Sequence, residues 1–106
     1  MLSGVYTWKD IIMIDPNVLI AALQGHLVVT LTYQKKTTGE TVSHTGGIYE
    51  INSADPSGAV VWLWDTSLND HIRKFLIGNI IDVQVLQEAF IPTQGWPFKL
   101  NGQIIP

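Results

Sequence analysis

The chain has 106 residues, of which 46% are hydrophobic and 14% are charged, and its formal net charge at pH 7 is −3. This length fits one domain, and the balance of apolar and charged residues excludes a disordered chain. Cysteine is absent, which excludes disulfide bonds and thiolate metal sites and favours a cytoplasmic location. No apolar run approaches the roughly 20 residues that span a bilayer, and the N-terminus lacks the pattern of a signal peptide, so we expect no membrane contact.

The first predicted element is a short helix. Residues 1–14 form an N-terminal segment in which Val5 to Ile14 mixes polar and aromatic residues and ends on IIMI, a pattern that suits either a short strand or a segment that docks on the barrel or on a partner. Asp15-Pro16 then favours a helix start, because an aspartate caps free amide groups and a proline at the first helical position loses no needed donor. The helix is predicted to run to about Gln24, with Gly25 as the left-handed terminating residue. Its apolar face consists of Val18, Leu19, Ala22 and Leu23.

Five strands follow, separated by turns rich in Gly, Pro, Asn, Asp and Ser. The clearest is residues 27–33, where apolar and β-branched residues alternate with the period of a half-buried strand. Gly46-Gly47 predicts a bulge or a sharp bend in the second strand. The predicted strands cover residues 27–33, 41–51, 59–64, 71–77 and 80–87. One short helix followed by this antiparallel meander predicts a mainly β, SH3/Sm-like five-stranded barrel over residues 15–92.

Residues 93–106 form a tail that carries Trp96, Phe98 and Leu100. Such a tail is too apolar to remain in water, so we expect it to pack on the barrel or on a second subunit.

The order of motifs between residues 15 and 92 resembles the WYL domain, a bacterial Sm-like barrel usually found C-terminal to a DNA-binding helix-turn-helix in transcription regulators. The motifs that carry the resemblance are the strand and turn LVVTLTYQKKTTGE, the pair Trp64-Asp65, the series Arg73, Phe75 and Ile80, and the strand VQVLQEAF. The resemblance implies a non-enzymatic ligand-sensing module for nucleotides or nucleic acid.

Several family positions differ in this chain. The Trp-Tyr-Leu triplet aligns with Ala-Val-Val at 59–61, and family arginines align with His44, Leu76 and Asn79. Only Arg73 remains of the family's basic set. About 15 residues precede the helix, too few for a winged helix-turn-helix, so the resemblance implies a degenerate, stand-alone copy.

The candidate ligand site centres on Arg73. His71 and Arg73 share one face of a strand, and a guanidinium group holds phosphate or carboxylate bidentately. The alternative is an ordinary ion pair of Arg73 with Asp65 or Asp70. The candidate ligand-binding residues are Arg73, His71, Lys74, Trp62, Tyr49 and His44.

Aromatic residues leave a second choice open. Trp62 and Trp64 share a face and suit stacking on a base, or one fills the core while the other covers the tail. The histidine spacing predicts no metal site, and no cofactor is expected. Ser43-His44 and Asp70-His71 contain parts of a catalytic triad, but sequence adjacency is not triad geometry, so no enzyme is predicted.

Two functions follow from these patterns. The first is a regulatory, ligand-sensing module for a nucleotide or another small anionic ligand. The net negative charge argues against sequence-independent nucleic-acid binding. The alternative is a structural or assembly protein that forms a homo-oligomer or contacts a protein partner through Trp96, Phe98 and Leu100.

Overall fold

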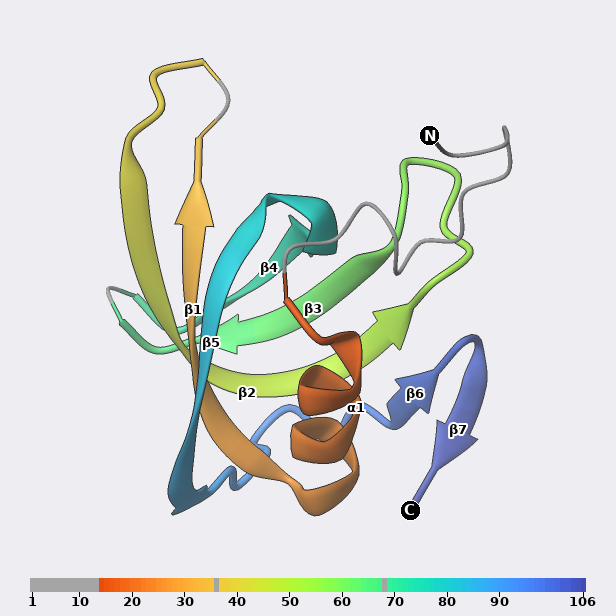
Figure 1. Ribbon diagram of the computed structural model, residues 1–106. Coiled ribbons are helices and arrows are strands. Elements are labelled where there is room, and N and C mark those ends of the chain that lie inside the picture. The colour runs from red at the N-terminus through yellow and green to blue at the C-terminus, as the bar shows by residue number, and fades with distance from the viewer. Residues whose placement is uncertain (1–13, 36, 68) are drawn as a thin grey trace.

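The computed structural model describes residues 14–35, 37–67 and 69–106, so the segment before Ile14 lies outside the described residues. The elements in chain order are α1 (Pro16–Gly25), β1 (Leu27–Gln34), β2 (Thr41–Asn52), β3 (Val60–Asp65), β4 (His71–Leu76), the 3₁₀ helix η2 (Ile77–Asn79), β5 (Ile80–Ala89), β6 (Phe98–Leu100) and β7 (Gln103–Ile105) (Figure 1). The predicted mainly β class is confirmed, and each of the five predicted strands lies within two residues of its observed bounds.

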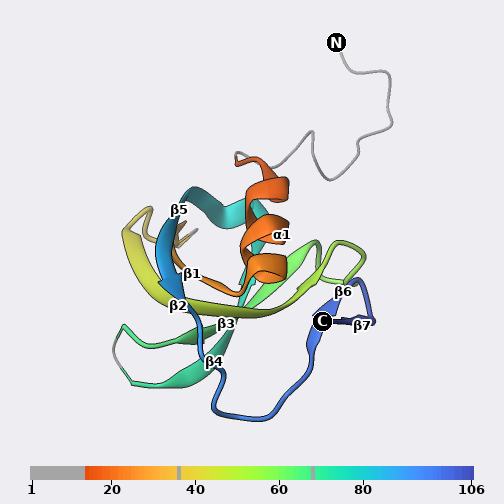
Figure 2. The same cartoon turned by 90° about the horizontal axis from the view of Figure 1, so that it is seen from below.

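The sheet is a curved meander with the strand order β4-β3-β2-β1-β5, in which all neighbours are antiparallel. It is not closed into the barrel that the sequence predicts, because β4 and β5 lie at the two ends of this order. Helix α1 lies in the concavity of the sheet and contacts β1, β2 and β5 (Figure 2). The helix therefore fills part of the space around which the strands would otherwise close, and η2 separates β4 from β5 in the chain.

Strand β2 bends between two partners. It pairs with β1 through residues 41–47 and with β3 through residues 46–52, so Gly46 and Gly47 belong to both ladders. A Cβ atom at Gly46 would lie 1.8 Å from the carbonyl oxygen of Trp64, and one at Gly47 would lie 1.9 Å from the Phe90 ring. The two glycines thus let β3 and the Phe90 ring lie close to the β2 backbone. The shift in register lies at Tyr49 rather than at the glycine pair.

Helix α1 begins as predicted, because Asp15 Oδ1 accepts a hydrogen bond from the Asn17 amide at 3.0 Å. The predicted left-handed residue is wrong by one position: Gly25 closes the helix, and His26 adopts φ 54°. The ring of His26 stacks on Phe98 at 4.3 Å, which holds this residue in place. Among the predicted apolar face, Val18 is 37% exposed and the other three residues are buried.

The sheet carries a core on each face. The main core lies between α1 and the concave face. Its largest fully buried side chains include Leu19, Leu31 and Leu63. A smaller cluster on the outer face contains Val28, Tyr49 and Phe90. The segment between β5 and β6 crosses this outer face on the side of the sheet opposite the helix (Figure 2), whereas Leu100 and Ile105 of the following hairpin pack against the main core.

The tail joins the sheet through a small hairpin. Strand β6 pairs in parallel with β2, where Glu50 lies opposite Lys99 and Ile51 opposite Leu100. Strand β7 then pairs with β6 in the antiparallel sense. Phe98 and Leu100 pack against the molecule's own cores, which leaves Trp96 as the more accessible of the three tail residues.

Candidate functional site

The predicted ligand residues divide between the two faces of the sheet. Cross-strand partners in an antiparallel pair point to the same side. Trp62 lies opposite Lys74, and Asp65 lies opposite His71. Trp62 and Lys74 therefore lie on the outer face. His71 and Arg73 lie on the helix face with the buried Asp65.

On the helix face, Asp65 is completely buried and is the centre of a polar cluster. Its Oδ2 atom lies 2.8 Å from His44 Nδ1 and 2.8 Å from Arg73 Nε. Its Oδ1 atom accepts hydrogen bonds from the amide of Ser67 at 2.9 Å and from the Ser67 hydroxyl. Arg73 Nε is close enough to Asp65 Oδ2 for an ion pair. Its N–H does not, however, have the geometry of a hydrogen bond to any described acceptor. The predicted alternative of an Arg73–Asp65 pair is thus present, with a buried rather than a solvated carboxylate.

The environment keeps Asp65 ionised. Burial raises the pKa of this carboxyl group, but the hydrogen bonds from Ser67 and the hydrogen bond and charge of His44 together outweigh it, so the pKa lies below its ordinary value. The cluster is therefore a charged anchor between β2, β3 and β4.

The described hydroxyl groups near His44 and His71 have other hydrogen-bond partners. The Ser67 hydroxyl donates to Asp65, whereas a triad requires a serine bonded to the histidine base. Ser43 shares a hydrogen bond with Thr32 Oγ1 at 3.2 Å, and His71 Nδ1 contacts the backbone oxygen of Asn69. Neither Ser43-His44 nor Asp70-His71 is joined in the order that nucleophilic catalysis needs.

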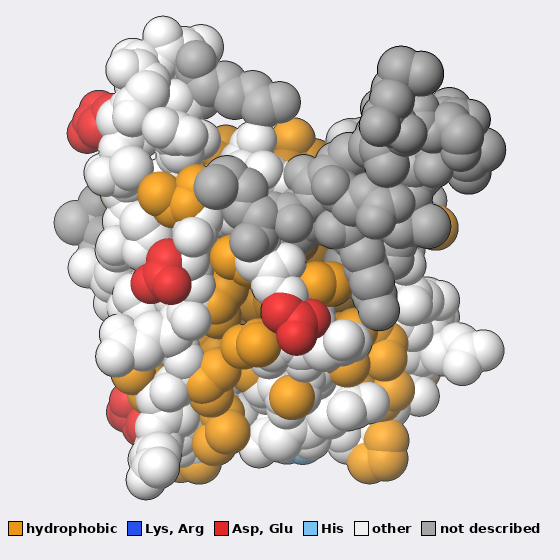
Figure 3. All heavy atoms as spheres, viewed as in Figure 1, with side chains coloured by type: hydrophobic (Ala, Val, Ile, Leu, Met, Phe, Trp, Pro, Cys, Tyr) orange, Lys and Arg blue, Asp and Glu red, His pale blue; other side chains and the backbone are white. Residues whose placement is uncertain are grey.

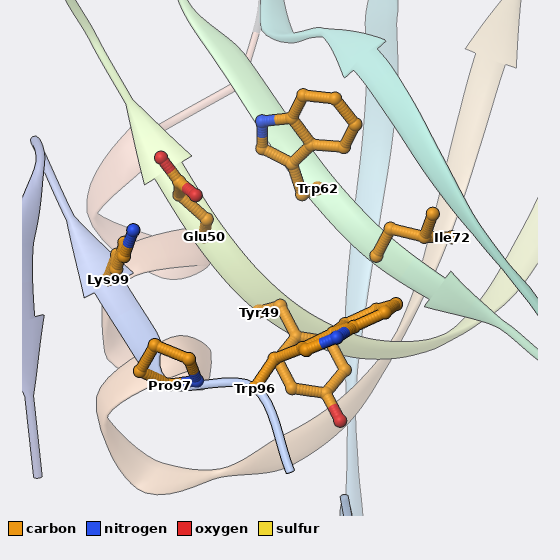
Figure 4. A pocket seen from close by; sticks show the side chains of 7 residues that line it. All are labelled: Tyr49, Glu50, Trp62, Ile72, Trp96, Pro97 and Lys99. Carbon is orange, nitrogen blue, oxygen red and sulfur yellow. The ribbon is translucent and has the colours of Figure 1, made fainter. Parts of the chain in front are cut away.

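On the outer face lies a cleft of about 340 Å³, hereafter the tryptophan cleft, which is shown in Figure 4. Trp62 and Trp96 lie across the opening from each other, with Ile72 at one end. Glu50 and Lys99 lie at the other end. The lining residues are Tyr49, Glu50, Trp62, Ile72, Trp96, Pro97 and Lys99. Four come from the sheet and three from the tail, so both parts build the cleft.

Aromatic contacts hold the cleft together. Tyr49 is 3% exposed, and its ring contacts Trp96 edge-on at 5.2 Å and stacks on Phe98 at 5.4 Å. Trp96 also contacts Trp64 edge-on at 5.7 Å. The Tyr49 hydroxyl is buried without a hydrogen-bond partner in the described part of the chain. Both tryptophans of the predicted stacking pair therefore lie on the outer face, with Trp64 against the tail.

Positive charge lies beside Trp62. The Lys74 ammonium group is 5.4 Å from the Trp62 ring centroid and 3.4 Å from Asp55 Oδ2. Hydrogen bonds from Ser57 and the neighbouring lysine lower the pKa of Asp55, so this partner is a carboxylate. Lys99 supplies a second ammonium group from β6. The tryptophan cleft thus combines aromatic rings with one lining cation, Lys99, and a second cation, Lys74, lies beside Trp62 outside the lining.

Of the lining residues, the sequence predicted Trp62 and Tyr49 as ligand residues and missed Glu50, Ile72 and the three tail residues. Asn101-Gly102 between apolar residues is a strong hairpin signal, and Asn101 has φ 51° in the β6–β7 turn. That signal predicts a hairpin without saying where it docks. Pro97 and Lys99 reach the cleft only because the tail docks beside β2 and β3. The local sequence pattern alone therefore does not predict them as lining residues.

A third region lies beside the helix and the edge strand β5. Apolar side chains gather over this face, with acidic side chains among them (Figure 3). A cavity of about 260 Å³ is lined by Ile14, Asp15, Val18, Ile81, Asp82 and Val83. None of these described lining residues is aromatic or positively charged, so the described lining of the tryptophan cleft suits a nucleotide better.

Comparisons with known proteins assign no relative: no family model, no curated protein and no solved structure matches this chain. Within the described ranges, no three His, Asp or Glu side chains are placed to hold a metal ion. The described helix is too short and insufficiently apolar to cross a membrane.

Proposed function

We propose that this chain is a non-enzymatic, regulatory sensing module of the WYL type that binds a nucleotide, or another planar ligand with an anionic group, in the tryptophan cleft. The observation that carries the proposal is the combination of Trp62, Trp96 and Lys99 at one opening, with Lys74 beside the Trp62 ring. The proposal includes a cytoplasmic, bacterial setting.

The chemistry of the lining suits such a ligand. Any nucleobase can stack on an indole ring, because every base has a π face. Lys99 and Lys74 neutralise a phosphate, and an ammonium group acts as a point charge that needs no fixed orientation. The Glu50 carboxylate accepts hydrogen bonds from ribose hydroxyls or an exocyclic amino group.

The fold supports the finer part of the proposal, an SH3/Sm-like small barrel left open between β4 and β5. Strand β1 lies between β2 and β5, so the last strand of the meander returns beside the first. This is the arrangement that a closing meander requires. The 3₁₀ helix η2 before β5 turns the chain back toward β1.

Isothermal titration calorimetry with adenosine monophosphate, guanosine monophosphate and adenosine tests the proposal. The two nucleotides should bind more tightly than adenosine, because adenosine lacks the phosphate. Trp62→Ala should weaken binding by about fivefold or more, since a stacked base contributes about 1–3 kcal/mol. Lys35→Ala, in the β1–β2 turn, is the matched control and should bind like the parent.

A second variant separates the two faces. Arg73→Gln should retain nucleotide affinity in a folded protein, because Arg73 lies on the helix face beside Asp65. Loss of binding in Arg73→Gln with full binding in Trp62→Ala would instead place the ligand near Arg73, His71 and His44. No binding of either nucleotide to the parent would refute the proposed function.

A second candidate function is self-assembly through the tail side of the molecule. Ile91 is 77% exposed, Ile104 is 70% exposed and Trp96 is 43% exposed. Large apolar side chains at such exposure favour contact with another protein surface. Sedimentation equilibrium tests it: a dimer or larger species that dissociates in Ile104→Lys supports assembly, and a concentration-independent monomer refutes it.

A further inference from the structure

A second recess lies on the same outer face, and we call it the acidic recess. Its volume is about 280 Å³. The lining residues are Val28, Thr45, Gly46, Gly47, Trp64, Thr66, Asp70, Glu88, Ala89, Phe90, Ile91 and Thr93. Trp96 lines the tryptophan cleft and contacts Trp64, so this aromatic pair lies between the two openings.

The charges of the acidic recess have one sign. Asp70 and Glu88 are the only ionisable residues in the described lining, and both are exposed. Among the described residues, neither carboxylate has an ion-pair partner. The other walls are largely apolar, with Trp64 and Phe90 as the largest side chains. An apolar recess with two unneutralised carboxylates favours a cation that has an apolar stem.

Gly46 and Gly47 line the acidic recess with backbone atoms. A Cβ atom at Gly47 would lie 1.9 Å from the Phe90 ring, so this ring packs directly on the Gly47 backbone and forms part of the wall. Trp64 is held on its other side by Trp96, so its ring is a fixed wall.

We propose that the acidic recess binds a lysine or arginine side chain presented by a protein partner. The carboxylates of Asp70 and Glu88 attract the charged end, and the Trp64 ring stabilises it by a cation–π contact. The methylene stem packs against Phe90 and Ile91, as long basic side chains do on apolar surfaces. The volume of about 280 Å³ has room for one such side chain. The proposal does not depend on the occupant of the tryptophan cleft.

The test is a ¹H–¹⁵N NMR titration with two blocked pentapeptides, Gly-Ser-Arg-Ser-Gly and the same peptide with citrulline in place of arginine. Citrulline keeps the shape and loses the charge. The arginine peptide should shift the amide signals of Gly46 and Gly47 and the indole signal of Trp64. Asp70→Asn and Glu88→Gln should each weaken binding by about two- to fivefold, as expected for exposed ion pairs. Glu40→Gln, an exposed carboxylate in the β1–β2 turn, is the control and should bind like the parent.

Three results would overturn this proposal. The first is equal binding of the citrulline peptide, because the charge would then be irrelevant. The second is parent-like binding by the folded double variant Asp70→Asn, Glu88→Gln. The third is saturation of the same signals by free spermidine at a lower concentration than by the arginine peptide, which would assign the recess to a small polyamine.

Discussion

At the scale of the residue, Asp65 shows how a completely buried charge is accommodated in a chain with few charges. A buried carboxylate is costly unless hydrogen bonds and counter-charges replace its water. Ser67 satisfies one oxygen, while His44 and Arg73 approach the other. His44 lies on β2 and Arg73 on β4, so one carboxylate joins three consecutive strands.

Asp65→Asn should lower the free energy of unfolding by about 2–4 kcal/mol at pH 7, because charged hydrogen bonds in a buried site are lost. The folded-state pKa of Asp65 lies below its ordinary value, so its contribution is complete above the unfolded-state pKa of about 4 and is lost as the pH falls through the folded-state pKa. Urea unfolding of both proteins between pH 7 and pH 2 measures this. The two curves should converge below pH ~4, and parallel curves would contradict the assignment. Asp55, whose pKa is also lowered, contributes equally to both proteins and cancels in the difference.

At the scale of the element, β2 is shaped by two glycines with different neighbours. The atom nearest a Cβ at Gly46 is the backbone oxygen of Trp64, which cannot move without disturbing β3. The atoms nearest a Cβ at Gly47 belong to the Phe90 side chain. The two positions therefore differ in whether a second substitution can relieve the clash.

Gly46→Ala and Gly47→Ala should each destabilise the protein by at least about 1–3 kcal/mol through overpacking. Phe90→Leu should recover part of the loss in Gly47→Ala and none of the loss in Gly46→Ala. Gly78→Ala, where no heavy atom lies within 4 Å of the new Cβ, is the control. Thermal or urea unfolding of the single and double variants gives the coupling energy between the two sites. Equal recovery in both backgrounds would contradict this account.

Element boundaries were predictable because strand and turn signals are local. The period-two alternation of residues 27–33 and the Asp15-Pro16 cap both correspond to observed elements. The left-handed position at His26 was not predictable, because a contact with Phe98, distant in sequence, holds it. Likewise, alternation shows which residues share a face of one strand, but it does not show that Trp62 and Arg73 point to opposite sides. That outcome depends on the register between β3 and β4.

At the scale of the whole molecule, the tail decides whether the tryptophan cleft exists. Trp96, Pro97 and Lys99 line the cleft only while β6 stays paired with β2. Asn101 anchors this arrangement. Its backbone N–H donates to Ile51 O at 2.8 Å, and its side-chain Oδ1 atom accepts from Ser53 N at 2.8 Å and from Ser53 Oγ at 3.0 Å. At the end of the tail, the backbone oxygen of Pro106 lies 2.9 Å from His26 Nε2.

Asn101→Ala and Asn101→Gly separate the two roles of this anchor. Both variants lose the acceptor for Ser53. Asn101 has φ 51°, and a left-handed backbone costs an alanine about 1–2 kcal/mol but costs a glycine little, so only Asn101→Ala is also strained. We therefore expect amide hydrogen exchange in β6 and β7 to accelerate more in Asn101→Ala than in Asn101→Gly. Nucleotide affinity should fall in the same order, since a cleft that is formed only part of the time binds in proportion to its population. Equal exchange in both variants would remove backbone strain from the argument, and exchange like that of the parent in both would show that the tail is held without Asn101.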